Sequence, residues 1–450
     1  MAYESLELAL KLSDEELLKK IEASKLRGRG GAGFLVSKKI SIVKNQTSDE
    51  KYIICNGIES DPWVFKDRTI LETKSEDVVE GMIILSKITG AKKGYICIKA
   101  KDNLAIEKVE KAIADAKSKA YLGFDILNLG WDFELEIIES PSNFITGEES
   151  SLISFIEGKR PEPIGKKEYP AIRGVFEKPT LVNNVETIAN IPNIILKSKS
   201  KFETETKLIS LRGNVMNEGV FEIPLGMTIE EIINTIGNGR KRGTIKFVSI
   251  GGITGSLIPE NMFDLKFDYE TLKENDISMG SGEILVLDEE SCIVELVKMR
   301  MKFMDEESCG KCTPCREGFK RISEILEKIT SVDSNSEDLD KLKELSAVIR
   351  ELSLCGFGKY GITPLISSLK YFYEEYESHI FEKKCYSGAC KNLVRYEITQ
   401  KCVGCGKCFK YCHLGAILKR GGNKYSIEVE RCDKCGICYQ ECPFEAIKKI

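Results

Sequence analysis

Two blocks of cysteines near the C-terminus have a spacing that suits iron–sulfur clusters. Cys402 to Cys412 and Cys432 to Cys442 each follow the pattern C-x2-C-x2-C-x3-C, and Pro443 follows the second block. Where two such blocks occur together, three cysteines of each block hold one [4Fe–4S] cluster and its fourth cysteine ligates the other cluster. The predicted sets are Cys402, Cys405, Cys408 and Cys442, and Cys432, Cys435, Cys438 and Cys412. Zinc is the weaker alternative, because structural zinc sites usually combine pairs of C-x2-C.

A third group of cysteines precedes these blocks. Cys309, Cys312 and Cys315 lie in the run ESCGKCTPCREG, and Cys355 in the run SLCG is the predicted fourth ligand. Four thiolates predict a third [4Fe–4S] cluster, with a structural zinc ion as the less favoured alternative.

Two further cysteines, Cys385 and Cys390, follow His379 within twelve residues. Two thiolates and one imidazole suit tetrahedral zinc, which needs one more ligand, such as a carboxylate from Glu307 or a thiolate. Two buried core cysteines and a capping histidine are an equal alternative. The remaining cysteines lie in apolar runs and are predicted as ordinary core residues: Cys55, Cys97 and Cys292.

The composition describes a globular protein without charge bias. The chain has 450 residues, 42% of them apolar, with 66 basic and 70 acidic residues and a net charge of −4. This balance gives no electrostatic reason to bind nucleic acid or an anionic membrane surface. No apolar run approaches the roughly 18 residues of a membrane-spanning helix, and Glu4 and Glu7 argue against a signal peptide. We therefore expect a cytoplasmic protein, in which the clustered cysteines indicate metal ligands rather than disulfides.

The pattern of apolar residues predicts an α/β multidomain chain. Strand-like runs at 51–55, 94–99 and 133–139 alternate with helical stretches at 77–88 and 103–116. This alternation is typical of a layered α/β domain.

The sequence pattern changes beyond residue 200. A strand, a turn at 217–219, a second strand and a helix capped by Thr228 predict a β-grasp-like domain. Helical spacing of apolar residues then predicts a bundle around the third cysteine group. The expected domains are an α/β domain over 1–200, a β-grasp domain over 201–290, a helical [4Fe–4S] bundle over 291–378, a zinc hinge over 379–395 and a ferredoxin domain with two [4Fe–4S] clusters over 396–450.

A glycine-rich run, RGRGGAGF at 27–34, precedes the basic residues Lys38 and Lys39. Closely spaced glycines let the backbone approach a phosphate or a flat ring, although a tight turn is the simpler alternative. Compact hydrogen-bonding side chains also occur at 55–62, 147–149 and 179–187, after apparent strands. Open α/β sheets bind ligands at such strand ends.

In this order, RGRGGAGF, NNVET and ESCGKCTPCREG resemble the NADH-binding, FMN-containing flavoprotein subunit of respiratory complex I. The likeness extends to soluble relatives in bifurcating hydrogenases and formate dehydrogenases, and runs from about residue 20 to about residue 370. The appended cysteines and ferredoxin blocks look like the β subunit of electron-bifurcating [FeFe] hydrogenases, without the N-terminal [2Fe–2S] domain usual there.

The resemblance implies a Rossmann-like FMN and nicotinamide domain in front of the β-grasp domain and the helical cluster domain. The positions that match FMN ligands in the family are Gly28, Arg29, Gly30, Lys39, Asn56, Glu59, Gly147, Glu148, Val182, Asn183, Asn184 and Thr187. The positions that match the nicotinamide side are Phe34, Lys39, Asp61, Glu149 and Tyr169. No protein acid or nucleophile is implied, because the flavin itself takes the hydride, with Glu149 near the nicotinamide.

Three departures from the family pattern concern the flavin. Ile58 replaces an acidic residue, Phe144 replaces a tyrosine, and Ser140-Pro141-Ser142 replaces a small glycine-rich run. Loss of an acceptor at Ile58 would weaken or retune FMN binding.

The resemblance implies an NAD(P)H-dependent oxidoreductase subunit that moves a hydride to FMN and single electrons through three [4Fe–4S] clusters. A bifurcating hydrogenase, a formate dehydrogenase or a transhydrogenase-type complex would use it, with a [2Fe–2S] subunit and ferredoxin or a cluster-bearing catalytic subunit as partners. The alternative is a relay subunit whose nucleotide site is lost, which Ile58 and Phe144 favour. An electron-entry subunit of a membrane complex is a third possibility.

Overall fold

A parallel four-stranded sheet forms the N-terminal part of the computed structural model, which describes residues 3–165, 168–197, 205–422 and 424–450. The strand order is β3-β2-β1-β4. The strands are β1 (Tyr52–Gly57), β2 (Lys93–Lys99), β3 (Glu134–Ser140) and β4 (Thr180–Asn184). The first three confirm the strands predicted from the apolar runs, to within two residues at each end.

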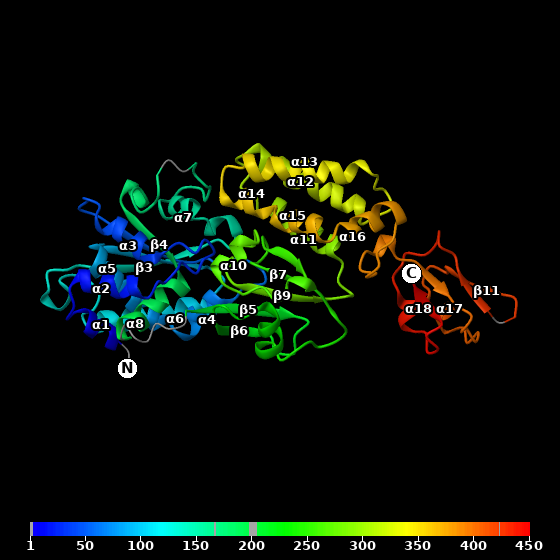
Figure 1. Ribbon diagram of the computed structural model, residues 1–450, viewed down its shortest axis with the longest axis horizontal. Helices are drawn as coiled ribbons and strands as arrows, with labels where there is room; N and C mark the ends of the chain where they lie inside the picture. The colour runs from blue at the N-terminus through cyan, green and yellow to red at the C-terminus, as the bar shows by residue number, and fades with distance from the viewer. Residues whose placement is uncertain (1–2, 166–167, 198–204, 423) are drawn as a thin grey trace.

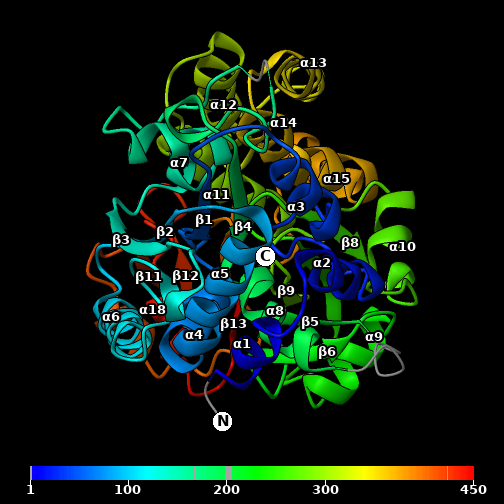
Figure 2. The ribbon, with the colours of Figure 1, turned by 90° about the vertical axis from the view of Figure 1, so that its left-hand side faces the viewer.

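Helices surround this sheet, as Figure 2 shows from the N-terminal end of the molecule. They are α1 (Glu4–Ala9), α2 (Asp14–Ala23), α3 (Val36–Lys44), α4 (Lys66–Thr73), α5 (Ser75–Thr89), α6 (Asn103–Ser118), α7 (Glu149–Ile156) and α8 (Val185–Leu196). α5 packs against α6 and α8. A Cβ added at Gly81 on α5 would lie 2.3 Å from the carbonyl oxygen of Ile188 on α8, so only glycine permits this approach.

A second sheet of five strands follows, with the order β6-β5-β9-β7-β8. Its strands are β5 (Thr206–Gly213), β6 (Gly219–Pro224), β7 (Ile245–Ile250), β8 (Ser256–Pro259) and β9 (Glu283–Asp288). β5 and β9 are parallel, and the other pairs are antiparallel. The short helices are α9 (Ile229–Glu231) and α10 (Tyr269–Glu274). The predicted cap is confirmed, because Thr228 Oγ1 accepts a hydrogen bond from Glu231 N at 3.1 Å.

The helical region carries the third cysteine group. Its helices are α11 (Ile293–Glu306), α12 (Thr313–Ile329), α13 (Glu337–Leu352), α14 (Gly356–Gly361), α15 (Thr363–Tyr371) and α16 (Tyr373–Glu377). Met301, Phe319 and Leu342 are fully buried between them. Cys312 and Cys355 lie at the residues that precede α12 and α14, so helix starts present them.

The last part of the chain is a small ferredoxin-like domain with a repeated plan. Strands β10 (Tyr396–Ile398) and β13 (Ile447–Lys449) pair, as do β11 (Ile417–Arg420) and β12 (Lys424–Ile427). α17 (Lys407–Tyr411) and α18 (Ile437–Gln440) each follow a glycine with positive φ, Gly406 at 76° and Gly436 at 78°. Each half of the cysteine repeat thus makes the same loop and helix.

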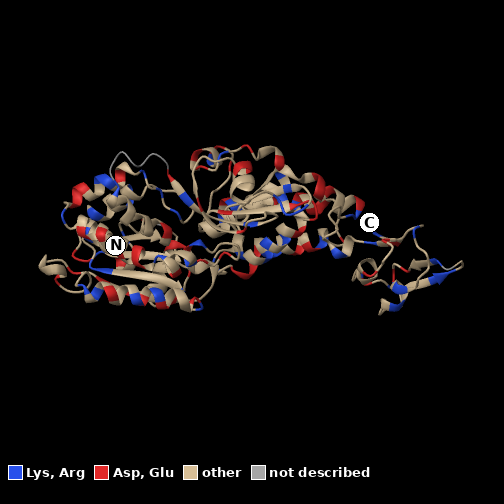
Figure 3. Ribbon diagram, turned by 90° about the horizontal axis from the view of Figure 1, so that it is seen from below, with Lys and Arg blue, Asp and Glu red and all other residues tan. Residues whose placement is uncertain are grey.

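The molecule is elongated, with the parallel sheet at one end, the bundle above the second sheet, and the ferredoxin-like domain at the other end (Figure 1). Basic and acidic residues are interspersed along the helices in the view of Figure 3. Within the described residues, none of the helices has both the length and the apolar character that crossing a membrane requires.

Candidate functional site

The glycine-rich loop lies against the carboxyl ends of β1 and β4. Asn56 on β1 pairs in register with Asn184 on β4, and a Cβ added at Gly30 would lie 3.2 Å from the Cβ of Asn184. The amide of Asn56 donates a hydrogen bond to the carbonyl of Gly147 at 2.9 Å. The structure therefore brings together the four segments predicted to hold FMN, at the sheet edge where open α/β sheets bind ligands.

Asn184 has protein partners at both ends of its amide. Its Oδ1 accepts hydrogen bonds from Glu186 N at 3.0 Å, as the cap of α8, and from Lys66 Nζ at 3.2 Å. Its Nδ2 donates to Asp67 Oδ2 at 2.5 Å. This side chain is held in one orientation by the protein alone.

Two more of the predicted flavin residues also act within the protein. Glu148 caps α7, since its Oε2 accepts hydrogen bonds from Ser150 N and Ser151 N, both at 2.9 Å. Thr187 Oγ1 accepts a hydrogen bond from Arg29 N at 2.9 Å, which ties the glycine-rich loop to α8. These contacts shape the strand-end site even without a direct bond to a ligand.

Three buried polar atoms near these segments have no hydrogen-bond partner in the described part of the chain: Asn183 Nδ2, Thr146 Oγ1 and Ser151 Oγ. A buried polar group left unpaired costs about 1–3 kcal/mol. FMN carries carbonyl, hydroxyl and phosphate oxygens that could accept from such donors. The residues present therefore fit a bound flavin, and Asn183 is the side-chain amide with a donor to offer.

Of the residues predicted on the nicotinamide side, the two aromatic ones lie at the surface and the charged ones are partly buried. Phe34 and Tyr169 expose 49% and 69% of their surface, so their rings are accessible to a nucleotide. Lys39 Nζ lies 3.3 Å from Glu149 Oε1 and donates to the carbonyl of Val182 at 2.9 Å. A partly exposed pair of this kind can contact a polar ligand without burying an uncompensated charge.

Asp61, also predicted on the nicotinamide side, joins a buried junction between three parts of the chain. Its Oδ2 accepts a hydrogen bond from Ile253 N, in the loop after β7, at 2.7 Å. Glu283 on β9 accepts from a backbone N–H of the same loop at 2.9 Å, and Arg300 on α11 donates to Ser249 Oγ at 2.7 Å. Burial raises the pKa of Glu283 to about 8, although Arg300 opposes the shift.

A buried network of charges lies behind the strand ends, and the sequence predictions included Glu59 of this network but not Lys66, Asp67 or Lys207. Lys66 Nζ lies 2.5 Å from Asp67 Oδ1 and 3.1 Å from Glu186 Oε2, and Lys207 Nζ lies 3.5 Å from Glu186 Oε2. Burial lowers the pKa of Lys207 to about 8, and burial raises the pKa of Glu59 to about 8. Lys66 and Asp67 look like surface charges in the sequence, because nothing local marks them for burial.

Two of the three departures from the family pattern, Ile58 and Phe144, pack as apolar side chains in the structure. Ile58 is 8% exposed and packs with the core above the sheet. The Phe144 ring lies 5.7 Å from Phe303 and 5.9 Å from Phe357, measured between ring centroids. Glu307 accepts a hydrogen bond from Phe144 N at 2.7 Å. Phe144 therefore ties the flavin region to the bundle.

The four cysteines of the bundle lie on the side of the flavin region. Leu354 N donates a hydrogen bond to Cys312 Sγ at 3.5 Å, which links the two cysteine loops. Burial raises the pKa of Cys355, and Glu148 adds to the shift, so the flavin segment lies within electrostatic reach of this group. Burial likewise raises the pKa of Cys315 to about 12, while a hydrogen bond from Ser308 opposes the shift.

Two small cavities in the ferredoxin-like domain are each lined by four cysteines. One cavity is lined by Cys402, Cys405, Cys408 and Cys442. The other is lined by Cys412, Cys432, Cys435 and Cys438. These are the two crossed sets predicted from the spacing, in which each block gives its fourth cysteine to the other.

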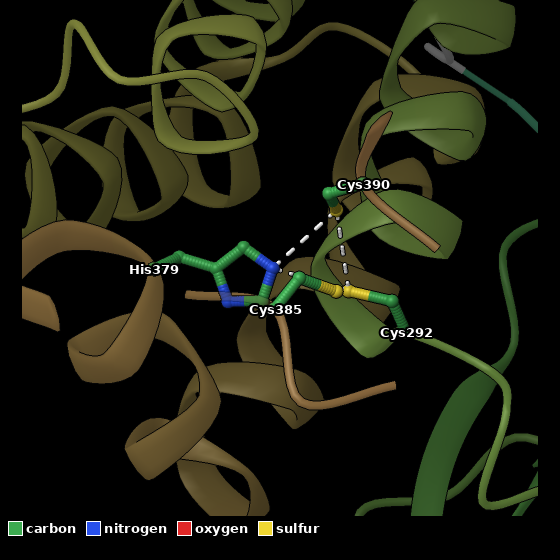
Figure 4. A group of neighbouring side chains, drawn as sticks. All are labelled: Cys292, His379, Cys385 and Cys390. Carbon is green, nitrogen blue, oxygen red and sulfur yellow. Dashed lines mark hydrogen bonds between the residues drawn. The ribbon is translucent and has the colours of Figure 1, made fainter. Parts of the chain in front are cut away.

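A fourth group of side chains that could hold a metal lies together at the start of α11 and in the segment after α16 (Figure 4). Cys292, His379, Cys385 and Cys390 are all buried, and their ligand atoms lie within 4.8 Å of one another. His379 Nε2 lies 3.4 Å from both Cys292 Sγ and Cys390 Sγ, and these two sulfurs are 3.6 Å apart. Hydrogen bonds with Cys292 and Cys390 lower the pKa of the Cys385 thiol.

These distances suit a single tetrahedral ion. With Zn–S near 2.3 Å and Zn–N near 2.0 Å, a tetrahedron has S···S edges of about 3.8 Å and N···S edges of about 3.5 Å. His379 Nδ1 donates to the carbonyl of Glu375 at 2.6 Å, which leaves Nε2 as the free ligand atom. The group could hold one metal ion.

The sequence did not predict Cys292 as the fourth member of this group. Cys292, expected as a plain core residue, is buried but lies among the ligands, as the residue that precedes α11. Glu307, the suggested carboxylate, is instead engaged with Phe144. Cys55 and Cys97 are buried in the parallel-sheet region, as expected of core residues.

Comparisons with known proteins agree with this arrangement. Residues 21–193 match the Nuo51 FMN-binding domain, residues 295–379 match the NADH-ubiquinone oxidoreductase-F iron–sulfur binding region, and residues 401–446 match a 4Fe–4S dicluster domain. The HndC subunit of the NADP-reducing hydrogenase of Solidesulfovibrio fructosivorans is 41% identical, over 92% of this chain and 86% of its own. The chain belongs to the family of NADH-quinone oxidoreductase F subunits and their hydrogenase relatives.

Other members of the family are also similar. An NADH-quinone oxidoreductase F protein of Rhizobium meliloti is 34% identical, over 85% of this chain and 93% of its own. A crystal structure of an NAD+-reducing [NiFe]-hydrogenase, in the H2-reduced state, superposes with a TM-score of 0.77 and 28% identity. That match covers 84% of this chain and 65% of the length of the hydrogenase chain.

Family membership settles the class of the protein. It is an NAD(P)H-oxidising oxidoreductase subunit with an FMN-binding domain and domains for [4Fe–4S] clusters, through which electrons pass. The resemblance seen in RGRGGAGF, NNVET and ESCGKCTPCREG is thereby confirmed.

Proposed function

We propose that this chain exchanges a hydride between NAD(P)H and FMN at the edge of the parallel sheet, and passes single electrons to three [4Fe–4S] clusters. The observation that carries the proposal is the amide nitrogen of Asn183, a buried residue of β4 next to Asn184, which has no hydrogen-bond partner among the described residues. Bound FMN would supply the conversion of a two-electron hydride into single electrons. The protein supplies binding, orientation and electrostatics.

The chain's own residues have distinct parts in this proposal. Asn183 donates to an acceptor of the flavin, and Asn184 holds the adjoining backbone in place through its cap of α8. Lys39 and Glu149 orient the polar part of the nicotinamide, while the exposed rings of Phe34 and Tyr169 stack on the nucleotide. The remaining predicted flavin residues, Gly28, Arg29, Gly30, Asn56, Glu59, Gly147, Glu148, Val182 and Thr187, shape the loop and the strand ends.

The proposed ligand sets of the clusters follow the cysteines. The first cluster takes Cys309, Cys312, Cys315 and Cys355, and the other two take the sets that line the cavities of the ferredoxin-like domain. The first cluster is the proposed immediate acceptor from the flavin side, because Phe144 packs on Phe357 and hydrogen-bonds Glu307 next to the cysteine loops.

We further propose zinc at Cys292, His379, Cys385 and Cys390. Along the chain, Cys292 precedes the first helix of the bundle and His379 follows its last helix. Cys385 and Cys390 belong to the segment that leads to the ferredoxin-like domain. One ion with four protein ligands and no open position is structural rather than catalytic. It would clamp the joint and keep the distal clusters in reach of the first.

The partners are proposed from the family. HndC belongs to a hydrogenase and the F subunits to quinone oxidoreductases, so this chain works inside a multisubunit complex. We propose a cytoplasmic complex of the bifurcating hydrogenase, formate dehydrogenase or transhydrogenase type, with a [2Fe–2S] subunit and with ferredoxin or a cluster-bearing catalytic subunit. A relay subunit without a working nucleotide site is the second candidate, which the apolar side chains of Ile58 and Phe144 favour.

Anaerobic purification of the chain with its partner subunits tests the two candidates. We expect FMN, about twelve iron atoms per chain from three clusters, and bleaching of the flavin absorbance by NADH or NADPH. The relay candidate instead predicts no flavin and no bleaching, with clusters that dithionite alone reduces. Iron sufficient for a single cluster would contradict the cluster assignment in either case.

A further inference from the structure

Ser308 touches a proposed ligand of the first cluster. Its Oγ lies 3.3 Å from Cys315 Sγ, and Gly310 N donates a hydrogen bond to the same Oγ at 3.3 Å. Gly310 uses an acceptor position of this oxygen and not its proton. The hydroxyl proton of Ser308 can therefore point at the sulfur. A cysteine that ligates iron carries no proton, so in the loaded site Ser308 must be the donor.

A second hydroxyl lies next to the same cysteine. Ser353 is 3% exposed, and its Oγ has no hydrogen-bond partner among the described residues. A Cβ added at Gly358 would lie 2.4 Å from Ser353 Oγ and 3.5 Å from the Cβ of Cys315, which makes these three residues neighbours. An unpaired buried hydroxyl next to a proposed cluster ligand fits an acceptor on the cluster, such as a sulfide.

In the ferredoxin-like domain, the cysteine sulfurs accept hydrogen bonds from different donors. Apart from a side-chain contact between Asp433 and Cys435, the hydrogen bonds to cysteine sulfurs there come from backbone N–H groups, such as Ala416 N to Cys412 Sγ at 3.2 Å and Ala446 N to Cys442 Sγ at 3.3 Å. Across the described part of that domain, no serine or threonine hydroxyl bonds to a cluster cysteine. Within the described chain, side-chain hydroxyl donors to cluster ligands thus belong to the bundle site.

We propose that Ser308 is a positioning residue that raises the reduction potential of the cluster at Cys309, Cys312, Cys315 and Cys355, with Ser353 as a second donor. A hydrogen bond to a ligand sulfur stabilises the reduced cluster, which carries one more negative charge, more than the oxidised one. One electron enters and no bond is made or broken, because the serine keeps its proton. The inference rests on the cluster assignment of the proposed function. It makes this cluster a better electron acceptor than its cysteine ligands alone would.

An EPR-monitored redox titration of the complete complex tests the role of Ser308. In Ser308→Ala we expect the midpoint of the first cluster to fall, with a change of up to about tenfold in its reduced-to-oxidised ratio at a fixed potential, or about 59 mV. Ser308→Thr, which keeps a hydroxyl, should restore the midpoint, and Ser353→Ala should lower it by less. The two ferredoxin clusters should not shift in any variant.

Ser346→Ala is the matched control, because Ser346 is a buried serine of α13 whose hydroxyl donates to the carbonyl of Leu342. An unchanged midpoint in Ser308→Ala with full iron content overturns the proposal. A second measurement compares the same two proteins without a redox titration. Pulsed EPR of the reduced wild-type complex, after equilibration in D2O, should show a deuteron coupled to the first cluster that is lost in Ser308→Ala, and an identical deuteron coupling in both proteins also overturns the proposal. Failure of the cluster assignment looks different, since the wild-type chain would then lack this cluster altogether, whereas failure of flavin binding would leave the cluster and its midpoint measurable.

Discussion

Two groups of four side chains are proposed as metal ligands, one within the bundle and one at its junction with the ferredoxin-like domain, and they differ in spacing. Cys292, His379, Cys385 and Cys390 are all buried and hold their ligand atoms within 4.8 Å of one another. The first-cluster cysteines are spread more widely, since among the described residues no three of them meet that distance, and Cys309, Cys312 and Cys355 are half-buried. A single ion needs ligand atoms in mutual contact, whereas a cluster needs room between its thiolates. The spacing of the two groups therefore supports the two different metals proposed for them.

The largest expected effect, loss of zinc, tests the contrast between the closely spaced group and the widely spaced cluster cysteines. We expect Cys292→Ala to bring zinc from about one per chain to near zero, because three ligands no longer enclose the ion. Iron content and NAD(P)H-dependent flavin reduction should persist, while electron transfer to the ferredoxin clusters slows. Zinc and iron analysis with stopped-flow absorbance measures both parts.

Two other variants sharpen the result. Cys97→Ala removes a buried cysteine on β2 that belongs to no ligand group in the described chain, and it should keep its zinc. The double variant Cys385→Ser, Cys390→Ser should behave like Cys292→Ala. Full zinc in Cys292→Ala would show that the ion binds elsewhere.

A second prediction concerns a junction that is held by charged side chains rather than by a proposed metal ion. Glu283 lies at the contact of three parts of the chain with Asp61, Ser249 and Arg300, and its pKa is raised to about 8. The folded chain then keeps the proton of Glu283 up to about pH 8, while the unfolded chain loses it near pH 4.5. Stability contributed by this group is full below pH 4.5 and declines as pH rises towards 8, by up to about 4 kcal/mol.

Glu283→Gln should remove that part of the pH dependence, because the amide mimics the protonated acid. Urea unfolding of the wild type and the variant between pH 5 and pH 8 gives the difference in unfolding free energy at each pH. We expect the variant to gain stability relative to the wild type as pH rises. Parallel curves would show that Glu283 titrates with an ordinary pKa.

The smallest expected effect separates two neighbouring amides of the flavin site. Asn183→Ala deletes a donor that is unpaired in the described chain, and should weaken FMN binding by about 1 kcal/mol with little loss of stability. Asn184→Ala removes the cap of α8, so it should cost about 1 kcal/mol of stability and lower FMN affinity as a consequence. FMN titration of flavin-depleted protein, with thermal unfolding of both variants, measures the pair. Equal effects on both quantities would contradict the division of roles.

The sequence by itself determined the ligands that lie close together along the chain. The crossed cysteine sets of the ferredoxin-like domain line its two cavities as predicted, because short loops leave three cysteines little freedom to lie elsewhere. The cap at Thr228 and the first three parallel strands were also predictable, since they depend on local hydrogen bonding and on apolar runs.

Only the tertiary structure decided the contacts between distant segments. Cys292 precedes His379 by 87 residues, and nothing around it distinguishes a ligand from a core cysteine. The burial of Lys66 against Glu186 is likewise invisible in a charged run of sequence. Such pairs form because packing of whole helices and sheets brings them together and removes water, and that packing depends on the sum of many contacts rather than on the residues concerned.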